Sequence, residues 1–277
     1  MLKQRVITAV VLLALLIPAL LAPVRWPFAV LTLLMIAAAG WEWARLNGAA
    51  GRSVGVGVLV AALCAAALAA GWDRSAPAWL WWTAAALWIV GGPLLLRAGP
   101  SAWPRAPVPA RHILGVGVLF AAWAAIAAAR TIGLNFILSI FCLVWAADIF
   151  AYFGGRAFGR RKLAPTISPG KSWEGAVSGL AGVLVLAAAW PVIDTSLTVD
   201  SPSIYTHLHA RGGWVGLVLG VVLLVAMSVV GDLFESLVKR SAGAKDSSNL
   251  LPGHGGVLDR IDALLPVFPI ALALRSF

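Results

Sequence analysis

The chain of 277 residues is 61% hydrophobic and only 12% charged, which is roughly half the charged fraction of an ordinary soluble domain. A soluble fold could not keep this much apolar surface away from water, so the composition excludes an ordinary soluble protein. The 21 Lys and Arg residues outnumber the 11 Asp and Glu residues and give a net charge of +10. Because these cations are divided among many loops, they indicate contact with the lipid bilayer and its anionic headgroups, and we expect no nucleic-acid partner.

Nine apolar runs recur along the chain, and each is near the ~20 residues that a helix needs to cross a ~30 Å hydrocarbon layer. Most of them lack the alternation of a barrel strand, and in lipid each segment must satisfy its own backbone hydrogen bonds. The sequence therefore predicts an all-α integral membrane protein with about nine transmembrane helices. The runs cover residues 6–23, 26–41, 54–71, 76–96, 112–129, 132–151, 175–193, 213–231 and 261–276.

The count depends most on the short run at 26–41 and on the last run, which contains Pro266 and Pro269. The first run follows Lys3 and Arg5 and so has the look of a signal peptide. It is longer than the ~7–15 apolar residues of a usual signal-peptide core, and we expect it to remain as the first helix.

The distribution of Lys and Arg predicts the orientation, because cytoplasmic loops carry an excess of positive residues. With nine helices and a cytoplasmic N-terminus, all but five of the 21 positive residues lie inside and the C-terminus lies outside. We therefore expect a multi-pass protein of the cell inner (cytoplasmic) membrane. The five outside are Arg25, Arg74, Arg130, Arg211 and Arg275.

Acidic residues divide the chain into two regions. Residues 1–110 contain only Glu42 and Asp73, whereas all other Asp and Glu residues lie within 148–262. We interpret residues 1–130 as N-terminal transmembrane helices that form a scaffold, and residues 131–277 as the C-terminal catalytic region. Two polar segments in this region, 154–174 and 232–262, are both expected on the cytoplasmic side, and the outer loop 194–212 is expected to be a plain connector.

Four polar side chains share one face at the cytoplasmic end of the eighth run, because they are spaced i, i+3, i+4 and i+7. They are Asp232, Glu235, Ser236 and Lys239. A salt bridge between Glu235 and Lys239, where the helix meets water, would account for only two of them. Asp232 comes directly after the apolar core, and ionisable groups at membrane depth usually line a functional cavity. The pattern therefore favours a functional site.

A polar loop then leads to Pro252-Gly253-His254-Gly255-Gly256. Glycines let the backbone approach a ligand and adopt positive φ, and the N-terminus of the next helix offers free N–H groups and a positive dipole end. Together these features predict a phosphate cradle. A glycine-rich turn between helices is also common for steric reasons alone, but this one stands beside several cations and acids.

Asp259 and Asp262 lie in the first turns of the last helix, where carboxylates can simply complement the helix dipole. Asp232 and Asp259, however, are expected to enter one cavity from two helices, provided that the loop 241–256 folds inward. Few carboxylates combined with substrate phosphates suit a divalent cation, and Mg²⁺ is the natural candidate. Asp148 is either a further site residue or the partner of a nearby cation such as Arg156.

The basic segment 154–174 can supply the other half of the site, since Arg and Lys neutralise phosphate oxygens. It is not a P-loop, because Gly170-Lys171-Ser172 is preceded by Pro165 where that motif requires glycine. It is not a dinucleotide-binding motif either, because Arg156 replaces the second glycine. Any phosphate site must therefore be of another kind.

The polar residues form an unbroken pattern that reads Ser236-x-x-Lys239-Arg240, then Lys245-Asp246, then Pro252-x-His254-Gly255-Gly256-x-x-Asp259-Arg260-x-Asp262. A string with this many fixed positions is far more specific than a lone glycine motif. It resembles the signature of the phosphatidate cytidylyltransferase (CDP-diacylglycerol synthase) family. The resemblance takes in Gly231-Asp232 and the stretches 151–156 and 168–175. Ser172 stands where threonine is frequent, a change that keeps the hydroxyl.

The resemblance implies an enzyme that transfers a cytidylyl group from CTP to phosphatidic acid, giving CDP-diacylglycerol and pyrophosphate, in phospholipid biosynthesis. It implies Mg²⁺ bound by Asp232 and Asp259, with a second, monovalent cation and a homodimer left open. The expected catalytic residues are Asp232, Lys239, Asp246 and Asp259. The expected substrate-binding residues are Arg156, Lys171, Ser172, Ser236, Arg240, Lys245, His254, Gly255, Gly256 and Arg260.

Two other functions compete with this one. A membrane kinase or transferase that uses CTP on a lipid alcohol would need a general base, for which only Asp148 and Asp246 are available. A transporter would place charges near the bilayer midplane and in corresponding repeats, whereas here the charges cluster on one side and in one half. The phosphate of phosphatidic acid is already anionic, so its reaction needs positioning and charge neutralisation rather than a base.

Overall fold

The computed structural model describes residues 2–276. Met1 and Phe277, the ends of the two predicted regions, lie outside the described residues, as do the side chains of Lys3 and Arg5. The first half contains α1 (Leu2–Leu21), α2 (Trp26–Leu46), η1 (Ala50–Arg52), α3 (Ser53–Ala69), α4 (Trp72–Ser75), α5 (Ala78–Ala86), η2 (Leu87–Gly91), α6 (Gly92–Ala98), η3 (Trp103–Arg105) and α7 (Val108–Ile132). The second half contains α8 (Leu134–Phe158), β1 (Lys162–Ala164), β2 (Ser168–Ser172), α9 (Trp173–Ser196), α10 (Ile204–Ser241), α11 (Leu258–Ile261) and α12 (Leu264–Ser276).

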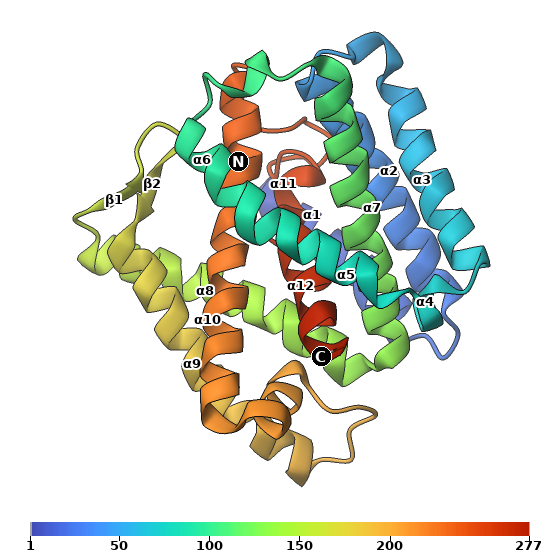
Figure 1. Ribbon diagram of the computed structural model, residues 1–277, viewed down its shortest axis with the longest axis vertical. Helices are drawn as coiled ribbons and strands as arrows, with labels where there is room; N and C mark the ends of the chain where they lie inside the picture. Colours follow the sequence, from blue (N-terminus) through green and yellow to red (C-terminus); the bar gives the residue numbers. More distant parts are fainter. Residues whose placement is uncertain (1, 277) are drawn as a thin grey trace.

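Each predicted apolar run coincides with helix in the described residues, and seven helices are long and apolar enough to cross a membrane. The prediction of an all-α membrane protein is confirmed, with a small hairpin of strands as the one addition in residues 2–276 (Figure 1). The short second run is part of the 21-residue helix α2. The apolar part of α1 is Val6–Leu21, and α12 has only 13 residues.

The last helix, α12, is enclosed by the rest of the bundle. Residues 264–273 are all buried, and α12 packs against α10, α7 and α5. The helices approach closely at Gly231 of α10, where a Cβ atom would lie 2.5 Å from the carbonyl oxygen of Asp262 and 2.8 Å from the ring of Pro266. Pro266 falls in the first turn of α12, a position that proline tolerates because its missing N–H has no partner there. The C-terminal helix α12 therefore holds α10 close to Asp262, which lies just before α12 in the chain.

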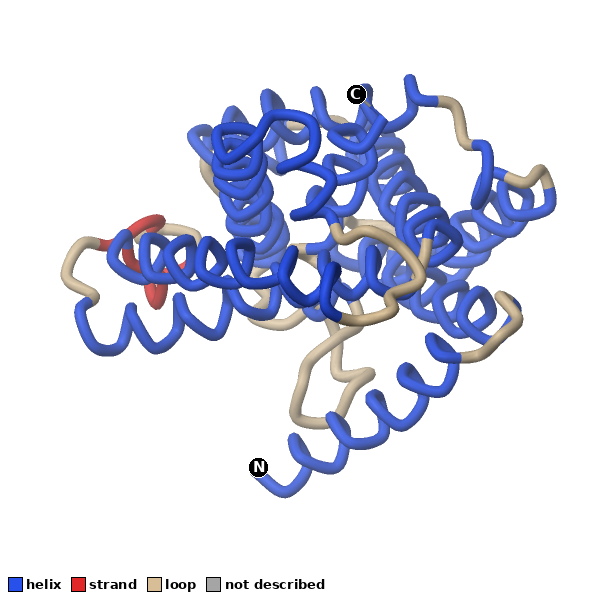
Figure 2. Tube along the Cα trace, turned by 90° about the horizontal axis from the view of Figure 1, so that it is seen from below, coloured by secondary structure: helices blue, strands red, loops and turns tan. Residues whose placement is uncertain are grey.

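Small residues bring α8 and α9 into close contact. A Cβ atom on Gly175 would lie 2.8 Å from the carbonyl oxygen of Ala151, and one on Gly179 would lie 2.7 Å from that of Ala147. This is the small-xxx-small packing that lets membrane helices approach without a hydrophobic driving force. Between the two helices the chain forms the antiparallel β1–β2 hairpin, which lies at the edge of the bundle (Figure 2).

An aromatic cluster joins the first half of the chain to α10. The ring of Phe234 packs against the rings of Trp43, Trp88 and Trp103, with centroid separations of 5.9, 5.3 and 5.5 Å. Such ring pairs contribute beyond the area that they bury. Because Phe234 lies between Asp232 and Ser236, this packing fixes the rotation of the polar face of α10.

The loop 197–203, which the sequence predicts to be a plain connector on the outer side, also contacts the start of α8. The Asp200 carboxylate accepts hydrogen bonds from the N–H groups of Leu134 and Asn135, at 2.5 and 2.9 Å, and so caps the N-terminus of α8. Burial alone would raise the pKa of Asp200, but these hydrogen bonds hold it below its ordinary value. Asp194 accepts a further hydrogen bond from the Asn135 amide at 2.8 Å.

Candidate active site

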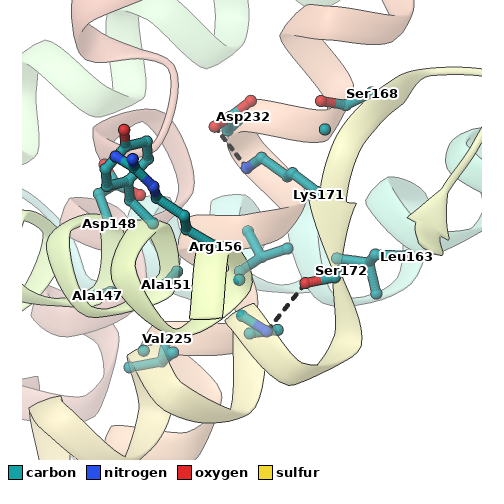
Figure 3. A pocket seen from close by; sticks show the side chains of 17 residues that line it. Ala147, Asp148, Ala151, Arg156, Leu163, Ser168, Lys171, Ser172, Val225 and Asp232 are labelled. Atoms are coloured by element: carbon teal, nitrogen blue, oxygen red, sulfur yellow. Dashed lines mark hydrogen bonds and ion pairs between the residues drawn. The ribbon is translucent and has the colours of Figure 1, made fainter. Parts of the chain in front are cut away.

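A cavity of about 640 Å³ lies between α8, the β1–β2 hairpin, α9 and α10. One part of its wall is made of small or apolar residues, namely Ala147, Ala151, Gly175, Ala176, Gly179, Val225 and Val229. The other part is polar, with Asp148, Arg156, Ser168, Lys171, Ser172 and Asp232 (Figure 3). A site with both kinds of wall suits a ligand that has an apolar and an anionic part.

Lys171 and Asp232 face each other at the polar end of this cavity (Figure 3). The Lys171 Nζ atom lies 2.5 Å from Asp232 Oδ2, and the Ser236 hydroxyl lies 3.4 Å from Asp232 Oδ1. Strand β2 carries Lys171 to this position, and Arg240 ties the hairpin to α10 by donating from Nε to the Ile167 carbonyl oxygen at 3.3 Å. The two polar segments that the sequence singled out are therefore in direct contact.

A second cluster lies deeper, around Lys239. Its ammonium group is 2.5 Å from Asp259 Oδ1 and also forms an ion pair with Glu235 one helical turn earlier. All three side chains are buried, with exposed fractions of 10% for Lys239, 5% for Asp259 and 1% for Glu235. One ammonium group thus serves two carboxyl groups in this buried cluster.

The glycine-rich loop folds inward onto Asp259, as the sequence predicts. Asp259 Oδ2 accepts hydrogen bonds from the Ser247 N–H at 2.8 Å, the Ser247 hydroxyl at 2.7 Å and the Gly256 N–H at 2.7 Å. Burial alone would raise the pKa of Asp259, but these hydrogen bonds and Lys239 lower it, so the group is ionised. Gly255 has a φ of +82°, and a Cβ atom there would lie 2.7 Å from Asp259 Oδ2. Glycine is therefore required by the packing of the loop around this carboxylate.

The sequence predicts that free N–H groups at the start of the last helix form a phosphate cradle. This prediction is wrong for the N–H groups of Val257 and Leu258. The N–H groups of Val257 and Leu258, at the start of α11, donate to the Glu42 carboxylate at 2.9 and 2.6 Å. Those donors, like that of Gly256, are taken by carboxylates of the chain itself. The cavity is instead lined by charged side chains, among them Lys171, Asp232 and Arg156.

The backbone of Asp262 lies close to α10, because a Cβ atom on Gly231, next to Asp232, would lie 2.5 Å from the Asp262 carbonyl oxygen. No group of three or more His, Cys, Asp and Glu side chains suited to a metal occurs among residues 2–276. The carboxylates of Asp232 and Asp259, which the sequence predicts as a metal-binding pair, are each paired with a different lysine.

The structure also gives partners within the chain to Ser172, Arg240 and Arg260, which the sequence predicts as substrate-binding residues. The Ser172 hydroxyl accepts a hydrogen bond from the Gly175 N–H at 3.1 Å and caps α9. Arg260 donates to the His254 carbonyl oxygen at 2.7 Å, and Arg240 donates to the Ala244 carbonyl oxygen at 3.0 Å as well as to the hairpin. Arg156 lines the cavity, whereas Lys245 and Asp246 are exposed on the loop. These roles in substrate binding stay predictions.

Sequence reasoning gave no role to Glu42, which the structure places against the same loop. This residue lies near the end of α2, in the half interpreted as a scaffold, and its carboxylate binds the start of α11. A signal was present, because an ionisable residue between Trp41 and Trp43 in an apolar helix is costly unless it has partners.

The chain is similar to known proteins along nearly its whole length. Residues 3–277 match the model of the cytidylyltransferase family. The phosphatidate cytidylyltransferase of Pseudomonas aeruginosa is 40% identical over 99% of this chain and 97% of its own length. The chain belongs to the cytidylyltransferase family.

Two further members of the family are more similar over a shorter stretch. The phosphatidate cytidylyltransferase of Haemophilus influenzae is 52% identical over 50% of this chain and 44% of its own length. The chloroplastic phosphatidate cytidylyltransferase 5 of Arabidopsis thaliana is 45% identical over 52% of this chain and 32% of its own length. The identity to these two relatives is thus higher than that to the Pseudomonas aeruginosa protein, but it extends over only about half of this chain.

Proposed function

We propose that the chain transfers the cytidylyl group of CTP to phosphatidic acid, giving CDP-diacylglycerol and pyrophosphate. The observation that carries this proposal is the cavity that joins an apolar wall to the Lys171–Asp232 pair, in a chain similar over nearly its whole length to a phosphatidate cytidylyltransferase. An apolar wall suits acyl chains, and the polar end suits a phosphate.

The geometry fits the demands of this reaction. An oxygen of the lipid phosphate attacks the α-phosphorus of CTP, and the bond to pyrophosphate breaks. The attacking oxygen is already anionic, so two polyanions must be neutralised and aligned rather than deprotonated. Lys171 and Arg156 on the cavity, with Lys239, Arg240, Lys245 and Arg260 on the neighbouring segment, are the cations available for this task.

Asp232 and Asp259 are the residues proposed to hold Mg²⁺. Hard carboxylate oxygens fit this ion, which commonly takes one or two carboxylates and completes its shell with water and substrate phosphates. Hydrogen bonds and Lys239 keep the pKa of Asp259 below its ordinary value, so its carboxylate is ionised and can contribute negative charge to a cation. When bound, the ion would neutralise charge on the transferring phosphoryl group.

Nine membrane-crossing helices with a cytoplasmic N-terminus and an outer C-terminus complete the proposal, which places the site on the cytoplasmic side of the inner membrane. Contacts between loops support it. Among the predicted outer residues, Arg25 pairs with Asp73 and Arg130 donates to the Ala22 carbonyl oxygen. A reporter fused after Phe277 should therefore be active outside the cytoplasm, and a cytoplasmic reporter would show that a span has been miscounted.

Purified protein in detergent, incubated with phosphatidic acid, Mg²⁺ and CTP labelled in the cytosine ring, tests the reaction. We expect a labelled lipid and an equal amount of pyrophosphate. Diacylglycerol, which lacks the attacking phosphate, is the matched control and should yield neither. Release of CDP with a phosphorylated lipid alcohol would instead identify a kinase, and absence of any labelled lipid would contradict the proposal.

A further inference from the structure

Glu42 is buried beside the candidate site although it comes from α2, far from the polar segments in sequence. Its side chain is fully buried and accepts hydrogen bonds from the hydroxyls of Ser247 and Ser248, at 3.2 and 2.6 Å. It also accepts hydrogen bonds from the N–H groups of Val257 and Leu258, at 2.9 and 2.6 Å. Both ends of the glycine-rich loop are therefore bound to one carboxylate.

The loop is closed tightly around this carboxylate. A Cβ atom on Gly256 would lie 2.2 Å from Glu42 Oε1 and 2.1 Å from the Ser247 hydroxyl oxygen. The N–H groups of Val257 and Leu258 have no partner within a helix, because they stand at the start of α11, and they donate to Glu42 instead. Glu42 provides that anion from within the chain, and an ionised buried group is stable only with such partners.

Two short connections lead from Glu42 to Asp259. The Ser247 hydroxyl lies 2.7 Å from Asp259 Oδ2 and 3.2 Å from Glu42 Oε2, so it stands between the two carboxylates. Leu258, whose N–H binds Glu42, directly precedes Asp259 in the chain. The position of Asp259 against Lys239 is thus set by the same loop that Glu42 holds.

We infer that Glu42 is a positioning residue for the reaction: its carboxylate holds the 247–258 loop so that Asp259 stays in place against Lys239 at the candidate site. The catalytic half of this inference rests on the proposed function, whereas the holding of the loop does not. The N-terminal region then contributes to the site itself, in addition to forming a scaffold.

Glu42→Gln is the decisive substitution, because it keeps the size of the side chain but removes its charge and turns an NH₂ group toward a backbone donor. We expect kcat to fall on the order of a hundredfold, which corresponds to about 2.7 kcal/mol at 1.36 kcal/mol for each factor of ten. The KM values for CTP and phosphatidic acid should change less than about threefold, since the loss is one of alignment in the transition state. Amide hydrogen exchange in the 247–258 loop should become faster, while exchange in α12 should stay as in the wild type.

Asp73→Asn is the matched control. Asp73 is the other buried acid of the N-terminal region, and its partner Arg25 lies just before the start of α2, at the opposite end of this helix from Glu42. Its replacement also removes one buried negative charge. We expect kcat and loop exchange of the folded protein to be unchanged, so that any shared loss of folding can be separated from the effect on the site.

Ser248→Ala provides a milder test, because it removes one donor to Glu42 and leaves the carboxylate in place. Faster loop exchange with a kcat reduced about threefold, which is under 1 kcal/mol, would support the inference even if Glu42→Gln failed to fold. Failure of Glu42→Gln to fold together with an unchanged Ser248→Ala would overturn it, as would wild-type kcat and loop exchange in a folded Glu42→Gln protein. If the wild type made no CDP-diacylglycerol, the proposed function would fail, and the exchange data would still decide whether Glu42 holds the loop.

Discussion

Two lysine–aspartate pairs with equal separations occupy different environments. The Nζ–Oδ distance is 2.5 Å both for Lys171–Asp232 and for Lys239–Asp259. The first pair is partly exposed on the cavity, with exposed side-chain fractions of 27% and 29%, whereas those of the second pair are 10% and 5%. An accessible pair can exchange its partner for a ligand, but a buried pair with further hydrogen bonds is held by the fold. The first pair is therefore open to contact with a ligand, whereas the fold holds the second pair in place.

The energetic consequences of the two environments also differ. Ion pairs open to solvent contribute about 0–1 kcal/mol to stability, while removing one partner of a buried pair costs about 3–5 kcal/mol because the other charge remains. Substitutions in both pairs should reduce activity, but only those in the Lys239 cluster should also unfold the protein at a lower temperature.

The largest effect is expected from Asp232→Asn and Asp259→Asn. Each substitution keeps size while removing one negative charge, and loss of a transition-state metal contact should lower the rate on the order of a thousandfold. The measurement is Mg²⁺-dependent pyrophosphate release from CTP and phosphatidic acid by protein that is well folded in detergent. Asp259→Asn should also lower the melting temperature, because its carboxylate accepts hydrogen bonds from Lys239, Ser247 and Gly256. Retention of more than about a tenth of the activity by both variants would contradict the metal assignment.

Lys239→Ala should produce the largest loss of stability. It leaves the buried carboxylates of Glu235 and Asp259 without their shared ammonium group, at a cost of about 3–5 kcal/mol. Thermal unfolding in detergent measures the loss, and Lys171→Ala serves as the matched control with an expected cost below ~1 kcal/mol. Equal losses in the two variants would remove the distinction between the pairs.

Lys171→Ala should lower activity while the protein stays folded. A hydrogen bond to a charged group contributes about 1.5–3 kcal/mol, so we expect roughly a tenfold to hundredfold fall in kcat/KM. Lys171→Arg keeps the positive charge and should recover part of the loss. If Lys171→Ala and Lys239→Ala both retained full activity, these cations would serve only to orient the helices in the membrane.

Asp200→Asn, remote from both pairs, should have the smallest effect. Loss of this cap on α8 should cost about 1 kcal/mol of stability and leave kcat unchanged. Because folding lowers the pKa of Asp200, its contribution is present above the unfolded pKa of about 3.9 and is lost as pH falls through the folded value. The stability difference between wild type and Asp200→Asn should therefore vanish in acid, and a difference independent of pH would argue against the cap.

Much of this protein could be predicted from local sequence patterns. Apolar runs of membrane length identify helices because lipid leaves the backbone no other partner, and α2 and α9 begin within two residues of the predicted positions. The polar pattern from Asp232 to Asp262 identified the family, since the chemistry of phosphate transfer places its charges in short segments. The sequence also predicts that the loop 241–256 folds inward, because the side chains of Asp232 and Asp259 could not otherwise reach the same cavity.

The tertiary structure decided which charges become partners. No spacing rule relates Glu42 to Val257, or Asp200 to Leu134, because these contacts join residues far apart in sequence through the packing of whole helices. Because of the same packing, the N–H groups at the start of α11, which were expected to bind phosphate, bind Glu42 instead. The packing also places Lys171 at the cavity and Lys239 in a buried cluster. Sequence periodicity determines which residues share a face of one helix, but the approach of Gly231 to α12 and of Gly179 to α8 determines which faces meet.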